Sequence, residues 1–179
     1  MVDIDNIWSN IISKLNSINP LYLFIRGDNI HNLPQPPYGT VNFISYVKES
    51  YTRKGNTQTK ATIDGIEKTK IEQPKLTFSI NCISNKQEEA LNMLRKVHTY
   101  LNNKGEQSLE EDDIILLDVT GGQNRTTVLE KDYIYKWGID ITVRVLEENV
   151  TLVDFAKRID IQEENTQTVS KIEIEGGIK

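Results

Sequence analysis

The sequence predicts an α+β fold: a single domain in which a mostly antiparallel β-sheet carries two amphipathic helices on one face. Two segments, residues 4–18 and 84–101, repeat apolar side chains every three to four positions, as amphipathic helices do. Elsewhere apolar and polar residues alternate, which is typical of a sheet that packs on one side only. The 179 residues, 37% of them hydrophobic, are enough for one domain with its own core.

The first predicted helix is bounded by recognisable signals. Asp3 or Asp5 is suited to cap its first turn. Pro20 ends it, because proline disfavours helical geometry in the residue before it. We expect a short strand at 21–26 and then an extended, proline-rich loop at 27–37.

The central part of the sequence is predicted to form two strands with a β-hairpin between them. Residues 38–51 form a strand that places four side chains on one face, namely Val41, Phe43, Ser45 and Val47. Residues 52–73 are polar and turn-rich, with turns at Lys54-Gly55-Asn56 and Asp64-Gly65, and predict a β-hairpin excursion with solvated faces. Residues 75–83 predict a central strand. Cys82 in this strand is expected to be a buried or half-buried, inert thiol that joins the apolar face only through a bulge.

The second helix is expected to begin with a capping box and to end at a glycine. The capping box is either Ser84 with Gln87 or Asn85 with Glu88, and Gly105 is the stop. Strands at 114–120 and 124–131 then follow an acidic run, Glu110–Asp113.

The clearest strand of the sequence spans Tyr135–Val145. Its odd-numbered residues, such as Trp137 and Ile139, are apolar and share one face of the strand. We therefore expect this strand to form the core. We divide the chain into an α+β domain at 1–150 and a C-terminal β-arm at 151–179. In the arm, apolar residues alternate with polar ones and are candidate interface residues: Ile159, Ile161, Val169, Ile172 and Ile174.

The sequence predicts no catalytic, cofactor-binding or metal-binding residues. Cys82 is the single cysteine, which excludes a cysteine-based zinc site, and His31 has no second metal ligand nearby. A Ser–His–Asp arrangement would have to use His31 or His98, and no Gly-x-Ser-x-Gly turn presents a serine to either. No glycine-rich phosphate loop occurs. The acidic run is the best enzymatic alternative: Asp112 or Asp113 would hold Mg²⁺ in a small metal-dependent nuclease or hydrolase. However, no Asp-x-Lys or Glu-x-Lys triplet, which restriction-like nucleases use, accompanies it.

Charge and hydropathy exclude further classes of protein. The net charge of −5 gives no basic surface for gripping nucleic acid. The longest plainly apolar run, residues 114–117, is far too short to cross a membrane. The first residues lack the pattern of a secretory signal, so we expect a soluble protein that is made and assembled in the cytoplasm.

Three segments resemble one family of bacteriophage proteins. Residues 21–46 read LYLFIRGDNIHNLPQPPYGTVNFISY, where a strand passes through a Pro-Pro-Tyr loop into the first long strand. Residues 75–101 form a strand followed by a capped helix, and Asn124-Arg125-Thr126 precedes the long strand at 135–145. This order resembles the phage neck or tail terminator proteins over residues 4–146.

The resemblance implies a structural role. Such proteins are ring subunits, commonly in hexamers, that cap the tail tube at the neck of the virion and dock it to the head connector. The implied partners are further copies of the chain, the tail tube protein and the connector or adaptor proteins. Genomic DNA would pass through the lumen without specific binding, because an acidic ring repels phosphate. The alternative in the same virion is a head-completion or connector-adaptor protein.

Overall fold

The computed structural model of the protein describes residues 2–28, 33–48, 57–62, 65–129 and 132–153. The chain forms two compact units. The first comprises Met1–Ser50 and Gln73–Glu147, and the second comprises Tyr51–Glu72 and Glu148–Lys179. The candidate interface residues of the arm, Ile159 to Ile174, lie outside the described residues, and the domain boundary at residue 150 stays a prediction.

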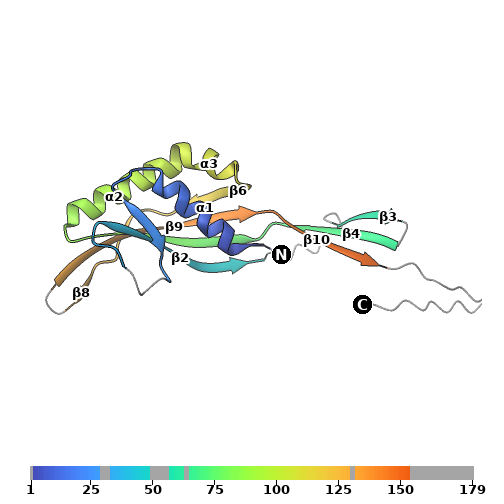
Figure 1. The fold of residues 1–179 in the computed structure, drawn as a ribbon, viewed down its shortest axis with the longest axis horizontal. Helices are drawn as coiled ribbons and strands as arrows, with labels where there is room; N and C mark the ends of the chain where they lie inside the picture. The colour runs from blue at the N-terminus through green and yellow to red at the C-terminus, as the bar shows by residue number, and fades with distance from the viewer. Residues whose placement is uncertain (1, 29–32, 49–56, 63–64, 130–131, 154–179) are drawn as a thin grey trace, which may run out of the picture. The chain divides into compact units, whose positions relative to one another are not determined.

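The first unit contains one sheet in the order β1-β2-β5-β9-β6 (Figure 1). Short strands β7 and β8 continue along β9 beyond the end of β6. The β1–β2 pair is parallel and the others are antiparallel, which confirms the predicted sheet and the central place of β5. The strands are β1 (Leu23–Arg26), β2 (Tyr38–Val47), β5 (Lys75–Ser84), β6 (Ile114–Val119), β7 (Gln123–Asn124), β8 (Thr127–Leu129) and β9 (Asp132–Val145).

The helices α1, α2 and α3 cover one face of this sheet (Figure 1). They span Ile4–Asn16, Gln87–Tyr100 and Glu106–Glu110, and a π-helical turn at Leu101–Gly105 joins the last two. Asp3 caps α1, since its Oδ1 accepts a hydrogen bond of 3.0 Å from the backbone nitrogen of Asn6.

The core lies between the helices and the sheet, as the alternation in residues 135–145 predicts. Neighbouring residues Phe78 of β5 and Ile141 of β9 are both fully buried there. The fully buried apolar side chains of these two strands are Leu76, Phe78, Ile80, Cys82, Ile139, Ile141 and Val143. Since these residues of β5 alternate along a regular strand, Cys82 needs no bulge to join the apolar face, and that expectation is wrong.

The second predicted helix begins and ends differently from expectation. Its N-cap residue is Lys86, without a side-chain hydrogen bond, while the Ser84 hydroxyl accepts from the Lys86 nitrogen and donates to Glu89. Gly105 does not end the helical path, because Leu101 and Leu109 on either side are anchored in the core. A Cβ at position 105 would lie 3.0 Å from the Tyr100 carbonyl oxygen, so the glycine permits a close approach there.

A bulge in β2 reverses the predicted faces of its second half. Phe43 pairs with Phe78 but Ser45 pairs with Thr77, which leaves Ile44 as the extra residue. A one-residue shift moves every later side chain to the other face. Ser45 and Val47 therefore lie on the opposite face of the sheet from Phe43, and the prediction that they share its face is wrong.

The second unit contains a smaller antiparallel sheet. Its strands are β3 (Thr57–Thr62), β4 (Gly65–Glu72) and β10 (Glu147–Val153), in the order β10-β4-β3. The β3–β4 pair confirms the predicted hairpin excursion, while the predicted turn at 54–56 lies outside the described residues. Within the described ranges, none of the helices is long and apolar enough to span a membrane.

Candidate functional site on the open face of the sheet

The structure separates the residues that the sequence singled out. His98 is half-buried on α2, with Nδ1 3.0 Å from Nδ2 of Asn102, while His31 lies outside the described residues. Burial of the Cys82 thiol raises its pKa to about 12, so it stays protonated and unreactive at neutral pH.

The acidic run is part of the turn that enters β6. Lys14 of α1 lies 3.2 Å from Asp112 and 3.9 Å from Glu111, while Asp113 has a positive φ of 59° at the turn. Across the described ranges, no group of three or more histidines, cysteines or acidic residues is placed to hold a metal ion. The run therefore acts in the structure as a salt-bridged turn.

The sheet face opposite the helices carries a polar cluster centred on Arg125. Its Nη1 donates hydrogen bonds to Oδ1 of Asn81, at 3.0 Å, and to the hydroxyl of Ser79. Its Nη2 donates to Oδ1 of Asp140 at 3.0 Å and to Oε1 of Gln123 at 3.4 Å. One guanidinium thus joins side chains from β5, β7 and β9.

Glycine in β9 makes room for this guanidinium. A Cβ at position 138 would lie 2.7 Å from Nη1 of Arg125 and 2.5 Å from Oδ1 of Asn81, closer than real contacts. The backbone nitrogen of Arg125 donates to the Lys136 carbonyl oxygen at 2.8 Å, which fixes the link between β7 and β8 beside β9. The cluster therefore requires glycine at position 138 of this otherwise regular strand.

Burial makes the cluster rigid. Asn81 and Ser79 are 2% and 7% exposed, so their oxygens depend on Arg125 for hydrogen bonds. Arg125 and Asp140 have 22% and 29% of their side chains exposed and neutralise each other. This arrangement holds the link between β7 and β8 in place against β5 and β9.

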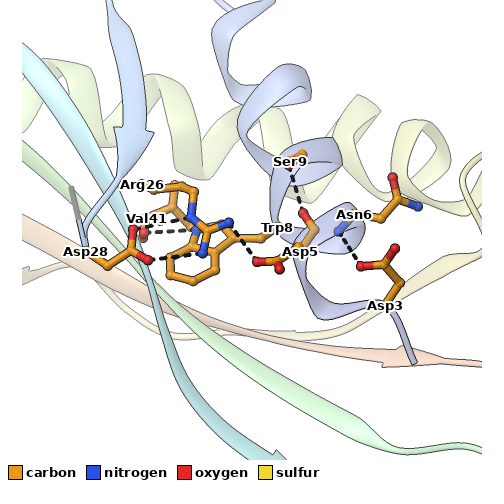
Figure 2. A network of polar contacts seen from close by, with 8 residues as sticks. All are labelled: Asp3, Asp5, Asn6, Trp8, Ser9, Arg26, Asp28 and Val41. Atoms are coloured by element: carbon orange, nitrogen blue, oxygen red, sulfur yellow. Dashed lines mark hydrogen bonds and ion pairs between the residues drawn. The ribbon is translucent and has the colours of Figure 1, made fainter. Parts of the chain in front are cut away.

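A second network fixes α1 to β1 (Figure 2). The Arg26 guanidinium lies 4.0 Å above the Trp8 ring, and its Nη1 is 2.7 Å from Oδ1 of Asp5. Its Nε and Nη2 donate to the carboxylate of Asp28 at 3.2 and 3.0 Å. Trp8 in turn donates from Nε1 to the carbonyl oxygen of Val41 at 3.0 Å. The hydrogen bonds to Asp28 and then to Asp5 raise the pKa of Arg26 above its usual value.

The outer edge of β1 is closed by a side chain. Phe24 donates from its backbone nitrogen to Oδ1 of Asn16 at 2.7 Å and accepts from Nδ2 of the same amide at 3.2 Å. The amide thus occupies the positions that an added strand would use. Such protection keeps an edge from pairing with other chains.

The sequence alone did not identify either arginine network. The signal for the Arg125 cluster was Gly138 inside the clearest strand, since such a glycine often marks a close approach. The Arg26 network joins residues about twenty positions apart, and no local pattern encodes that contact.

The family model described as "Phage neck terminator protein" matches residues 5–169. No match was found among curated proteins.

Proposed function

Since the chain belongs to the phage neck terminator proteins, structural components of the virion neck, we propose that its copies form a ring that caps the tail tube and joins the tail to the head connector. The family match is the observation that carries the proposal, because it extends over residues 5–169 and so includes parts of both units. A neck component assembles with other tail and head proteins of the virion. We propose as specific partners the tail tube protein, the connector or adaptor proteins, and further copies of the chain in a ring of about six.

The described residues suit a subunit that acts through shape. Both Arg125 and Arg26 are held by several acceptors, so the segments they join keep one conformation. A ring that must bind the tail on one side and the connector on the other benefits from such a rigid body. We propose that the protein has no catalytic activity of its own.

The net charge supports passage of DNA through the ring. Each copy carries −5, so a hexamer would carry about −30, and phosphate is repelled by such a surface. We propose that genomic DNA passes through the lumen without specific binding. A gel-shift titration at low salt, where electrostatic binding is strongest, is expected to show no complex with duplex DNA.

The C-terminal segment is proposed to act outside its own subunit. The candidate residues Ile159, Ile161, Val169, Ile172 and Ile174 alternate with polar ones and would add to a sheet edge of a neighbour.

Ring formation is tested by negative-stain microscopy and native mass measurement on the purified protein. We expect rings with six-fold symmetry. Rings of twelve would favour a head-completion or connector-adaptor protein, and a protein that stays monomeric at high concentration would contradict the proposal.

Capping is tested by adding the protein to growing tubes of tail tube protein. Elongation is expected to stop, with the protein located at one tube end. Tubes that grow to the same length with and without it would contradict the capping role. Incubation with DNA and Mg²⁺ is the matched test of the enzymatic alternative: cleavage that Asp112→Asn abolishes would overturn the structural role.

A further inference from the structure

The second half of β2 forms an unpaired edge of the main sheet. β1 pairs with β2 only along residues 38–41. Among the described residues, no strand pairs with residues 42–47 on that side, and Ile44 and Val47 are 53% and 49% exposed. The edge of β1 itself is closed by Asn16. On this side of the sheet, a further strand would therefore pair with residues 42–47.

The opposite side of the sheet ends in β6. Within the described ranges β6 pairs with β9 alone, and its Ile115 and Leu117 are 41% and 40% exposed. Asp118 is the one charged residue of β6, and β2 contains none. Strand edges with few charges are templates for pairing. The sheet thus has two unpaired edges of six residues each, both with exposed apolar side chains.

The two edges lie at the same level of the sheet. Rows of paired residues cross the sheet from β2 through β5 and β9 to β6, and the side chains of one row lie on the same face. Three such rows are Val47, Lys75, Arg144 and Ile115; Ser45, Thr77, Thr142 and Asp118; and Phe43, Phe78, Ile141 and Val119. A second copy set beside the first, without a shift along the strands, would therefore bring residues 42–47 next to β6 with their side chains in phase.

The strand directions also fit. Each neighbouring pair from β2 through β5 and β9 to β6 is antiparallel, so β6 runs antiparallel to β2. If the sheet continues into the next copy in the same sense, β6 meets β2 as an antiparallel pair, which is slightly more stable than a parallel one. Because the two edges are on opposite sides of one sheet, they cannot pair within a single chain.

Each edge carries a bulge beside the same row. The bulge of β2 is at Ile44, next to Ser45, and that of β6 is at Leu117, next to Asp118. A bulge bends its strand and increases the local twist, which disfavours pairing with a regular strand. Two edges that bend at the same row remain suited to each other. The edge of β3 is less suited, since its register with β4 has no shift and its residues are polar apart from Ala61.

We propose that β6 of one copy pairs with residues 42–47 of β2 in the next copy, so that the sheets of neighbouring copies form one continuous sheet. This inference rests on the proposed ring. The contact joins two different surfaces of the chain, and such a head-to-tail contact is the kind that closes a ring. It places Ile115 beside Val47 and Asp118 beside Ser45, so that no like charges face each other across the pair.

Cross-linking between two differently tagged full-length variants tests this pairing. One variant carries Val47→Cys and the other carries Ile115→Cys, and a short bismaleimide joins cysteines without requiring an exact register. The native Cys82 is buried and its pKa is raised to about 12, so it does not compete. The control replaces Val47→Cys with Leu23→Cys on β1, a position that is 50% exposed but lies on the strand that Asn16 closes.

We expect a cross-linked dimer that carries both tags with Val47→Cys and none with Leu23→Cys. Adding Leu117→Lys to the β6 variant is expected to lower the yield about tenfold, because a lysine on an edge strand disfavours pairing. Leu21→Lys, at an exposed position outside both edges, is expected to leave the yield unchanged. Equal yields at Val47 and Leu23, or a yield that Leu117→Lys does not change, would overturn the inference.

Further outcomes separate this inference from the proposed function. Val47→Cys variants that cross-link with each other would indicate a two-fold pairing of β2 with β2, against the inference. Rings seen by microscopy in the same samples, without any cross-link between Val47 and Ile115, would overturn the inference and leave the ring standing. Absence of both rings and cross-links would overturn the two together.

Discussion

Replacing Arg125 with alanine is expected to destabilise the first unit by about 2–4 kcal/mol, because it leaves buried acceptors without a donor. Asn81 is 2% exposed, and together with Ser79 it accepts from Nη1 of Arg125. Each buried acceptor left unsatisfied costs about 1–3 kcal/mol. The pair with Asp140 adds at most about 1 kcal/mol, since both side chains are partly exposed and screened by water.

Gly138 allows the same site to be tested from the opposite strand. A methyl group at position 138 would displace the Arg125 guanidinium and the Asn81 amide, so Gly138→Ala is expected to destabilise the protein as well. When Arg125 is replaced by alanine, the steric clash between the new methyl group and the guanidinium is removed. The double variant should therefore lose about 1–2 kcal/mol less than the sum of the single variants.

Urea unfolding followed by tryptophan fluorescence measures these free energies. Arg95→Ala, at an exposed position on α2, is the control and should change stability by less than about 0.5 kcal/mol. Single-variant effects that add to within about 0.5 kcal/mol would refute the coupling between Arg125 and Gly138. An Arg125→Ala variant as stable as the control would refute the account of the cluster.

Three further predictions concern the core, the thiol and the arm. Ile141→Ala should cost about 2–5 kcal/mol in the same titration and Thr142→Ala less than about 0.5, since Ile141 is fully buried and Thr142 is on the open face; equal effects would mean that both faces are covered. Cys82 should react with iodoacetamide at pH 8 only after denaturation, because burial raises its pKa to about 12, and labelling of the folded protein would contradict its burial. Deleting residues 157–179 should leave the monomer's thermal midpoint unchanged but impair ring formation, and a truncated chain that unfolds or assembles normally would refute an assembly role for the arm.

The main sheet and helices could be predicted because local patterns encode them. The alternation at Tyr135–Val145 corresponds to β9 with its buried face, and the stripe after Asp3 corresponds to α1 with its cap. The errors arise where a tertiary contact outweighs a local signal. Gly105 is a helix stop by propensity, yet burial of Leu101 and Leu109 carries the helical path past it.

The bulge in β2 and the two arginine networks depend on contacts between distant parts of the chain. The residues around Ile44 contain no local signal for the bulge, because the pairing of β2 with β5 sets the register. Arg125 finds its acceptors on strands 44 to 46 residues away in sequence, at Asn81 and Ser79. Hence the sequence predicted the layers of the fold, but not the polar cluster on its open face.

The two sheets differ in how they are stabilised, and the difference bears on assembly. Every buried apolar side chain among the described residues belongs to the first unit, where the helices cover the sheet. The β10-β4-β3 sheet has Ile71 half-buried and Val150 and Leu152 largely exposed. Three strands need a packed hydrophobic face for independent stability. A partner that covers these side chains would therefore add burial, so ring formation is expected to stabilise the smaller sheet more than the helix-covered one.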